Sequence, residues 1–358
     1  MKISKIELSN YRKYDKKEVH FDFGINIICG NNAAGKTSIL EALHYLIMLR
    51  SFKNTIDDSI IRLGSDEVVI FGVFEQEKTQ KNALVLISKY YKKMSLDGRI
   101  IKKASEYIGF ADVVSFGIDD VDIISGAPSN RRKMMDMFFS QYDPLYIEKL
   151  REYKNLVKER NALLKDLDCT NKHYTILLKV IDNKLSVLSE ELTLIRSDIV
   201  KTINDYLVNI HYQLSGENEK CFIKYISSWE ITKGITQLVD VREKDLIYKT
   251  TTIGPHRDDY AFCLDGYNLS KYGSQGQKKT AMLSFKLACV ELLKQKKHRN
   301  PIVLLDDVFG ELDSKRHNSL LKFLDNDIQT IITTPSLKEL KQELIDKANI
   351  IYLEKEEV

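Results

Sequence analysis

Eight residues close to the N-terminus have the types and the spacing that bind a chain of phosphates. Residues 30–37 are Gly-Asn-Asn-Ala-Ala-Gly-Lys-Thr, which fits the pattern G-x-x-x-x-G-K-[ST]. In such a loop the backbone N–H groups bind phosphates, the lysine reaches the β- and γ-phosphates, and the last hydroxyl binds Mg²⁺. The sequence therefore predicts a nucleoside triphosphate site formed by Gly30, Asn31, Asn32, Ala33, Ala34, Gly35, Lys36 and Thr37.

A second chemical group follows an apolar run near the C-terminus. Residues 302–305 are Ile-Val-Leu-Leu, and two carboxylates, Asp306 and Asp307, come next. A buried strand that ends in an acid beside a phosphate loop places that acid near Mg²⁺. We predict that Asp306 and Thr37 hold the metal and that Asp307 and Lys36 are catalytic. Asp307 would orient the attacking water or take its proton. The alternative is a strand followed by a solvated Asp-Asp turn.

A third stretch, residues 274–277, precedes a predicted helix. Its sequence Ser-Gln-Gly-Gln puts Ser274 at the N-cap position, and a plain helix cap is one interpretation. It also resembles the Leu-Ser-Gly-Gly-Gln signature of ABC-type ATPases, with Gln275 in place of the first glycine. In that superfamily the signature of one subunit closes on the ATP held by another. The resemblance implies an ATP-dependent homodimer in which Ser274, Gln275, Gly276 and Gln277 contact the nucleotide, and residues 310–313 match the D-loop that follows.

The flanking elements fit these roles and argue against a chance match. Residues 25–29 are short, apolar and β-branched, as in a buried parallel strand. From Lys36 onward apolar residues recur at helical spacing, which predicts an amphipathic helix. Further strands are expected at 1–8, 19–23, 68–74 and 83–91, with a hairpin turn at Asp97-Gly98.

The middle of the chain predicts a helical insertion. Pro128 and Pro144 are placed to start helices, and apolar residues recur every three or four positions from Leu177 to Ile210. Residues 145–167 are the expected antiparallel partner, and a subdomain packed on itself is favoured over an intermolecular coiled coil. We expect irregular helix to continue to about Tyr248. The predicted fold is α/β, an ABC-type P-loop ATPase head with a mixed sheet, split into 1–117 and 250–358 by a helical arm at 118–249.

Bulk composition excludes several classes of protein. The chain has 358 residues, a formal net charge of +3 and 43% hydrophobic residues, so any basic surface must be local. Candidate clusters are 102–103, 131–133 and 294–299, where solvated helix faces are the alternative to a DNA-binding surface. The sequence contains no apolar run of 18 residues and no signal peptide, and its five cysteines are scattered. A reduced cytoplasmic location without a membrane is expected.

Several stretches in one order resemble the RecF family of bacterial recombination mediators, relatives of the SMC and double-strand-break repair ATPases. They are Asn10-Tyr11-Arg12, residues 30–37, 49–53, Ala127-Pro128 with Arg131-Arg132, 254–259, 274–278 and 304–307. The resemblance implies a slow, DNA-stimulated ATPase that acts as a switch and binds double-stranded DNA near single-strand gaps. It also implies RecR and RecO as partners in loading RecA during recombinational repair, the SOS response and fork maintenance. By the same resemblance Arg12 contacts the nucleotide.

Some positions depart from the family pattern. Residues 116–120, Phe-Gly-Ile-Asp-Asp, lack the usual proline, and Ala33-Ala34 is unusual in the phosphate loop. His256-Arg257 fits either a structural network with Asp258 or Asp259, or a nucleotide or DNA contact. Alternatives to the family's function are a diverged paralogue, an SMC-like defence ATPase and, less favoured, a transporter ATP-binding subunit.

Overall fold

The computed structural model describes residues 1–53, 57–76, 79–166, 172–216, 219–311, 314–323 and 327–353. The chain divides into two compact units. We call residues 1–121, 206–219 and 279–358 the head unit, and residues 122–205 and 220–278 the arm unit. The expected domains differ from this division at 118–121 and 206–219, which group with the head unit, and at 250–278, which group with the arm unit.

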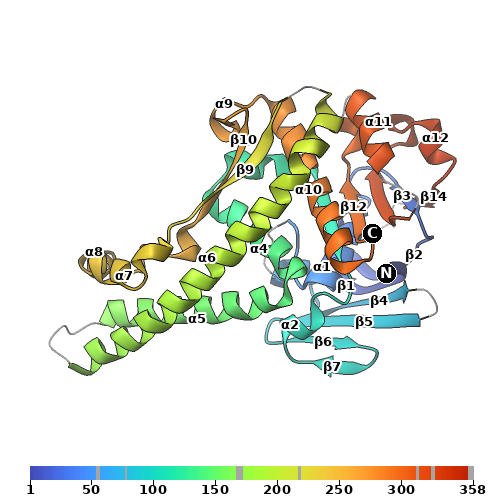
Figure 1. Cartoon of the computed structure of the whole chain (residues 1–358). Coiled ribbons are helices and arrows are strands. Elements are labelled where there is room, and N and C mark those ends of the chain that lie inside the picture. Colours follow the sequence, from blue (N-terminus) through green and yellow to red (C-terminus); the bar gives the residue numbers. More distant parts are fainter. Residues whose placement is uncertain are drawn as a thin grey trace. The chain divides into compact units, whose positions relative to one another are not determined.

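The core of the head unit is a parallel sheet that carries the predicted phosphate-loop strand (Figure 1). Its order is β14-β3-β13-β12-β8, and every neighbouring pair is parallel. The strands are β3 (Ile25–Cys29), β8 (Val113–Gly117), β12 (Ile302–Asp306), β13 (Thr330–Thr334) and β14 (Asn349–Tyr352). Because β13 lies between β3 and β12, the phosphate loop and the two carboxylates leave the same edge of the sheet, one strand apart.

The second sheet of the head unit is antiparallel, in the order β2-β1-β4-β5-β6-β7. Its strands are β1 (Lys2–Tyr11), β2 (Tyr14–His20), β4 (Glu67–Gln76), β5 (Thr79–Ser88), β6 (Lys92–Leu96) and β7 (Arg99–Ile101). The turn predicted at Asp97-Gly98 joins β6 to β7, with φ of 51° and 78°. Positive φ at both central residues is the geometry of a two-residue hairpin turn.

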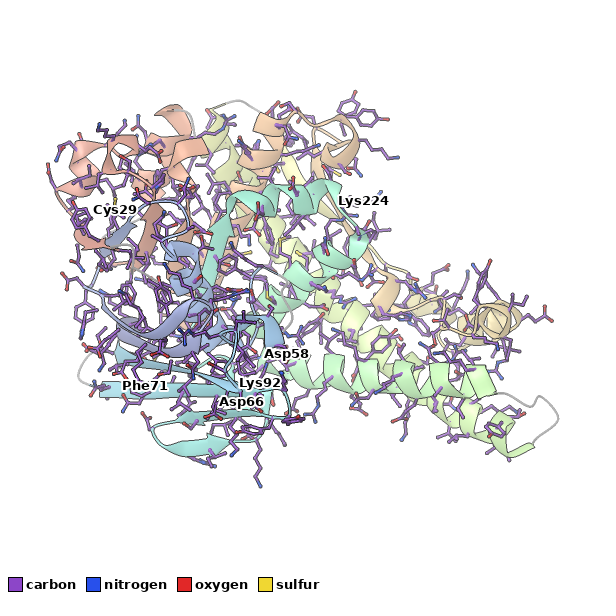
Figure 2. All side chains as sticks on the ribbon, turned by 180° about the vertical axis from the view of Figure 1, so that it is seen from behind. Cys29, Asp58, Asp66, Phe71, Lys92 and Lys224 are labelled. Atoms are coloured by element: carbon purple, nitrogen blue, oxygen red, sulfur yellow. The ribbon has the colours of Figure 1, made fainter. Side chains whose placement is uncertain are left out.

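Helix α1 (Lys36–Met48) follows the phosphate loop and contacts strands of both sheets, among them β1, β4, β12 and β13. The sequence predicted an amphipathic helix, but α1 is buried along nearly its whole length because a sheet covers each side. Even Glu41 and His44 are buried. At its C-terminal end, Lys92 of β6, labelled in Figure 2, donates to the Leu49 carbonyl at 3.2 Å and lies over the Tyr45 ring.

Shorter elements complete the head unit. They are the helices α2 (Ala104–Tyr107), α11 (Ser314–Phe323) and α12 (Gln342–Ile345), most of α10 (Gln275–Lys297), and the 3₁₀ turns η1 (Asp57–Ile60), η2 (Ile118–Val121), η5 (Phe309–Glu311) and η6 (Leu337–Glu339).

The arm unit is built on the helices α3 (Asp122–Ser125), α4 (Pro128–Tyr142), α5 (Pro144–Asp166) and α6 (Lys172–Ser215), of which residues 206–215 belong to the head unit. Helices α4 and α5 begin at Pro128 and Pro144, as predicted. Ion pairs of 2.7 Å join Lys149 to Glu191 and Arg160 to Asp182. Because residue numbers rise along α5 as they fall along α6, the two helices are antiparallel, as expected.

The arm unit also contains a small sheet, in the order β11-β10-β9. Its strands are β9 (Cys221–Ile226), β10 (Asp259–Leu264) and β11 (Tyr267–Asn268), and its remaining elements are η3 (Ile231–Lys233), α7 (Thr236–Asp240), α8 (Arg242–Tyr248), η4 (Pro255–Arg257) and α9 (Leu269–Tyr272). The expectation of irregular helix to about Tyr248 was wrong at β9. Cys221 and Ile223 alternate with less buried residues and pair with β10, so the local period is that of a strand.

Some expectations fall on residues outside the described ranges, namely Leu312 and Asp313 of the D-loop match and Cys169. Cys29, Cys221, Cys263 and Cys289 are buried. Among the described helices, none is long and apolar enough to cross a membrane.

Candidate nucleotide-binding site

The predicted phosphate loop and the two carboxylates meet at one pocket of the head unit, with a volume of about 370 Å³. Its lining residues are Lys13, Asn32, Ala33, Gly35, Lys36, Thr37, Ser38, Asp306, Asp307 and Thr333. Seven of these were predicted as site residues from the sequence. A cavity of this size is within the range of small-molecule sites.

The loop is held in shape from outside by β2 and the residue before it. Gly35 has φ of 92°, and a Cβ there would overlap the Tyr14 hydroxyl, so only glycine fits. That buried hydroxyl donates to the Ala34 carbonyl at 3.1 Å, and Lys13 Nζ donates to the Ala33 carbonyl at 3.3 Å. Sequence reasoning missed Lys13 and Tyr14, although they directly follow the Asn10-Tyr11-Arg12 motif.

The side chain of Lys36 folds back onto the first residues of the phosphate loop. Its ammonium donates to the Gly30 carbonyl at 2.6 Å and to the Asn31 carbonyl at 3.0 Å, and the residue is buried. The N-cap of α1 is Gly35, which has no side chain to bind the N–H groups of the first turn. A buried ammonium and an uncapped helix N-terminus together make a site for anionic oxygens.

Oxygen donors converge on the other side of the pocket. Thr37 Oγ1 and Thr333 Oγ1 each donate to Asp306 Oδ1 at 2.8 Å. Mg²⁺ prefers oxygen ligands such as hydroxyl and carboxylate groups. It usually binds only one or two protein ligands, together with water and phosphate oxygens. Among the described residues, no group of three or more His, Cys, Asp or Glu side chains could hold a metal ion. The residues present fit Mg²⁺ bound together with a phosphorylated ligand.

Asp307 has an unusual backbone. Its φ is 57°, and its N–H donates to Thr333 Oγ1 at 3.0 Å. A left-handed conformation is uncommon for residues other than glycine, although aspartate adopts it more readily than most. Here it turns the chain at the end of β12, so that Asp306 and Asp307 both line the pocket. Both carboxylates thus lie at the pocket, and the catalytic role of Asp307 stays a prediction.

Lys13 lines the pocket, whereas the side chain of Arg12 binds Glu41 of α1. Its Nε and Nη2 donate to both oxygens of Glu41 at 3.0 and 2.8 Å, and its Nη1 donates to the Ser59 carbonyl at 2.7 Å. Burial acts to lower the pKa of Arg12, but the hydrogen bonds to Glu41 and the negative charge of Glu41 outweigh burial and raise that pKa. Arg12 thus neutralises a buried carboxylate of α1, and its predicted contact with the nucleotide stays a prediction.

The segment at 116–120 links the end of β8 to α10 through the side chain of Asp120. Asp120 Oδ2 accepts from the Gly117 N–H at 3.1 Å and pairs with Lys286 of α10 at 3.2 Å. Both charged residues are buried. The loss of proline from this stretch leaves its last acid with a structural role in the head unit.

The signature stretch forms a capping box at the start of α10. Ser274 Oγ accepts from the Gln277 N–H at 3.2 Å, and Gln277 Oε1 accepts from the Ser274 N–H at 3.0 Å. The N-cap predicted for Ser274 is therefore confirmed. Ser274 and Gln275 are exposed. Because Ser274 and Gln275 are exposed while the cap is formed, a second molecule can reach this stretch.

The Gly-Pro-His-Arg-Asp-Asp segment, 254–259, is mainly structural in the arm unit. Asp258 accepts from buried Arg196 at 2.7 Å, and Asp259 pairs with Arg131 at 2.7 Å. His256 accepts a hydrogen bond from Tyr153 and donates to the Thr251 carbonyl at 3.0 Å. The two acids are thus neutralised by Arg196 and Arg131, not by Arg257.

The basic clusters divide into structural and exposed residues. Arg132 donates to the Asp258 carbonyl, and Lys297 and Arg299 both pair with Asp112. Lys102 and Lys133 remain exposed. The runs of positive charge in the sequence therefore overstate the charge available to a ligand.

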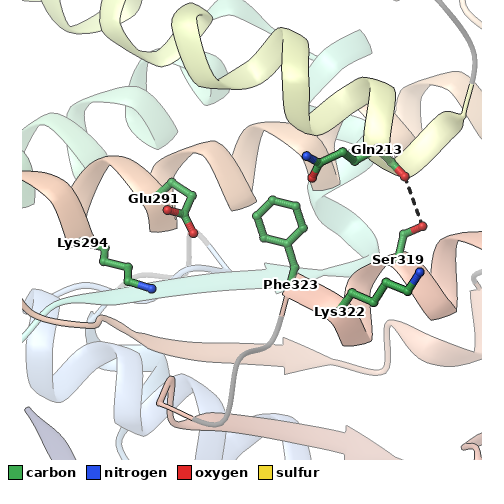
Figure 3. A pocket seen from close by; sticks show the side chains of 6 residues that line it. All are labelled: Gln213, Glu291, Lys294, Ser319, Lys322 and Phe323. Carbon is green, nitrogen blue, oxygen red and sulfur yellow. Dashed lines mark hydrogen bonds between the residues drawn. The ribbon is translucent and has the colours of Figure 1, made fainter.

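The head unit has a second pocket, of about 490 Å³, away from the predicted motifs (Figure 3). It is lined by Gln213, Glu291, Lys294, Ser319, Lys322 and Phe323. The Ser319 hydroxyl donates to the Gln213 carbonyl at 3.2 Å, as the dashed line in Figure 3 shows. Its lining mixes both signs of charge around one aromatic ring.

Comparison with known proteins gives the same family from sequence and from structure. Residues 2–357 match the model for the RecF/RecN/SMC N terminal domain. The chain is 35% identical to the DNA replication and repair protein RecF of Ligilactobacillus salivarius (strain UCC118), over 99% of this chain and 96% of the relative. The chain belongs to the RecF family. The RecF protein of Agathobacter rectalis is 37% identical over 100% of this chain and 99% of its own length.

Solved structures agree with this assignment. The recombination mediator protein RecF with ATP, in the RecFOR pathway, matches with a TM-score of 0.88 and 30% identity over 95% of this chain and 93% of that one. An Smc head domain with an extended coiled coil from Pyrococcus furiosus matches with a TM-score of 0.53 and 16% identity, over 99% of this chain and 94% of that one, a likeness of fold. The predicted fold, an ABC-type ATPase head with a helical insertion, is confirmed.

Proposed function

We propose that this RecF-family chain binds ATP with Mg²⁺ and hydrolyses it slowly, as a switch. The observation that carries the proposal is the convergence of Lys36, Thr37 and Asp306 on one pocket. The structure of a 30%-identical RecF protein with ATP supports it. Equilibrium binding of a fluorescent ATP analogue tests it, with Lys36→Ala as the variant that should lose affinity.

The roles of the residues follow from their chemistry. Lys36 and the first-turn N–H groups of α1 bind the phosphates, and Thr37 and Asp306 hold the metal ion. Mg²⁺, when bound, neutralises charge on the phosphates. Asp307 orients the attacking water or accepts its proton, because its carboxylate reaches the same pocket from the next position of the chain.

We further propose that ATP brings two copies together, with Ser274, Gln275, Gly276 and Gln277 of one copy over the nucleotide of the other. The exposed capping box supports this role, since a second molecule can reach it. Ser274→Arg should keep ATP binding and abolish ATP-induced dimers in light scattering. Persistent dimers in that variant would refute the assignment of the signature.

The proposed biological role is the one carried by the family. The dimer binds double-stranded DNA near single-strand gaps and works with RecR and RecO to load RecA in recombinational repair, in the cytoplasm. The RecFOR context of the solved RecF structures supports it. A gel shift with gapped duplex at several salt concentrations, with and without ATP, tests it, because binding through phosphates weakens steeply with salt. Absence of binding in every condition would refute the DNA role.

A further inference from the structure

Two tyrosines of the arm unit stand exposed directly before the signature stretch. Tyr267 is 68% exposed and Tyr272 is 73% exposed, and their ring centroids lie 6.4 Å apart with an interplanar angle of 80°. Large aromatic side chains usually contribute their area to a core or an interface. Two that touch each other in solvent form a small aromatic platform.

The platform is fixed from both ends. Tyr267 follows the tight turn of Asp265 and Gly266, with φ of 47° and 86°, and it pairs with Leu264 across the hairpin. Tyr272 ends α9, whose N-cap Asn268 accepts from the Ser270 N–H at 2.8 Å. Because a hairpin and a capped helix fix the backbone at both positions, no loop has to become ordered when a ligand packs on the two rings.

Gly273 alone separates Tyr272 from Ser274, and Tyr267 lies seven residues before Ser274. The Gly273 N–H donates to the Leu269 carbonyl at 3.0 Å, and a Cβ on Gly273 would lie 2.7 Å from that oxygen, so the approach needs glycine. Two residues span at most about 7 Å. The Cα of Tyr272 therefore lies within about 7 Å of that of Ser274, and the ring contact joins Tyr267 to Tyr272. A nucleotide whose terminal phosphate meets Ser274 is long enough to extend toward these rings.

We propose that Tyr267 and Tyr272 form a subsite for the purine base of a nucleotide whose γ-phosphate meets Ser274. The inference rests on the proposed function, because that nucleotide is held by the phosphate loop of a second copy. A flat base can stack on one ring and meet the edge of the other. The subsite makes dimerisation depend on the base as well as on the phosphates.

The test compares dimerisation with different nucleotides by light scattering. The wild-type chain should dimerise at lower concentrations of ATP than of CTP, because a purine offers more stacking area. The double variant Tyr267→Ala/Tyr272→Ala should need about tenfold more ATP and should lose the preference, since base stacking on an aromatic residue is worth about that much or more. Its binding of ATP as a monomer should not change.

Two matched variants control for side effects. Tyr272→Phe keeps the ring and should dimerise like the wild type. Tyr248→Ala removes a tyrosine that is 65% exposed in the same unit but is remote in sequence from Ser274, and it should have no effect. Unchanged melting temperatures confirm that the variants fold.

Three outcomes would overturn the proposal. If the double variant dimerises with the wild-type concentration dependence and base preference, the platform does not read the base. If it weakens dimers equally with ATP and CTP, the tyrosines contact protein instead. If the wild-type chain forms no dimers with any nucleotide, the proposed ATP-dependent dimerisation is refuted, and the proposed base subsite is refuted with it.

Discussion

The hydroxyl of Thr37 donates to the carboxylate of Asp306 at 2.8 Å, although 269 residues separate them in the sequence. The first ends the phosphate loop after β3, and the second ends β12. Asp306 also accepts from Thr333 of β13, the strand between them. One carboxylate oxygen thus joins the ends of three neighbouring strands at the place where a metal ion would bind.

This relationship predicts how the metal ligands respond to substitution. Thr37→Ala should lower the rate of Mg²⁺-dependent ATP hydrolysis about a hundredfold, because it removes an oxygen that positions the ion. Thr37→Ser keeps the hydroxyl and should retain most of the rate. Phosphate release at several Mg²⁺ concentrations measures both, and equal rates in the Ala and Ser variants would contradict the assignment.

Arg12 allows stability and nucleotide binding to be separated. Arg12→Ala should cost about 3 kcal/mol of unfolding free energy, because Glu41 is left buried without its partner. Glu41→Gln breaks the same pair but keeps the arginine. If Arg12 also contacts the nucleotide, ATP affinity should fall more in Arg12→Ala than in Glu41→Gln; equal losses would limit Arg12 to its structural role.

Tyr14 supports the phosphate loop through one hydrogen bond. Tyr14→Phe removes the buried hydroxyl that donates to the Ala34 carbonyl and should cost about 1 kcal/mol of stability. We expect ATP affinity to fall a few-fold, because the loop loses its external support. Urea unfolding and ATP titration measure the two effects, and unchanged values for both would show that the contact is dispensable.

Two buried histidines predict a loss of stability in mild acid. Burial lowers the pKa of His44 and of His256 to about 4, against an ordinary value of 6.5. Between these values the unfolded chain binds protons that the folded chain excludes, so stability is full above pH 6.5 and falls as the pH drops toward 4. Each histidine should remove about 2 kcal/mol between pH 7 and pH 5.

Unfolding free energies at pH 7 and pH 5 check this expectation. His44→Gln cannot titrate in this range and should lose about half as much stability over that interval as the wild-type chain. A variant with the same pH dependence as the wild type would show that other groups govern acid sensitivity.

A buried ion network should stabilise the arm unit. Arg160 is fully buried and donates to Asp182 at 2.7 Å and to Asp245 at 2.5 Å. Arg160→Met should cost about 3–5 kcal/mol, because buried carboxylates lose their counter-charge. Adding Asp245→Asn should recover part of the loss in thermal melts. No recovery would mean that the packing of Arg160, and not its charge, is what matters.

Local patterns in the sequence determined much of this protein. The phosphate loop, the apolar strand before Asp306, the prolines that begin α4 and α5, the hairpin turn at Asp97-Gly98 and the cap at Ser274 depend on neighbouring residues, so spacing alone predicts them. The same motifs, taken in order, identified the family. They also gave most of the residues that line the pocket.

Tertiary structure decided what depends on distant partners. The burial of α1 on all sides, the pairing of Arg12 with Glu41 and the support of the loop by Tyr14 arise because two sheets meet around one helix. Strand β9 forms because β10, more than 30 residues away, pairs with it. The basic runs at 131–133 and 294–299 suggest available positive charge in the sequence. In the structure, however, Arg131 forms an ion pair with Asp259 and Arg299 forms one with Asp112. A charged side chain is available to a ligand only when the fold leaves it without an ion pair. The spacing of residues in the sequence does not show which side chains are paired.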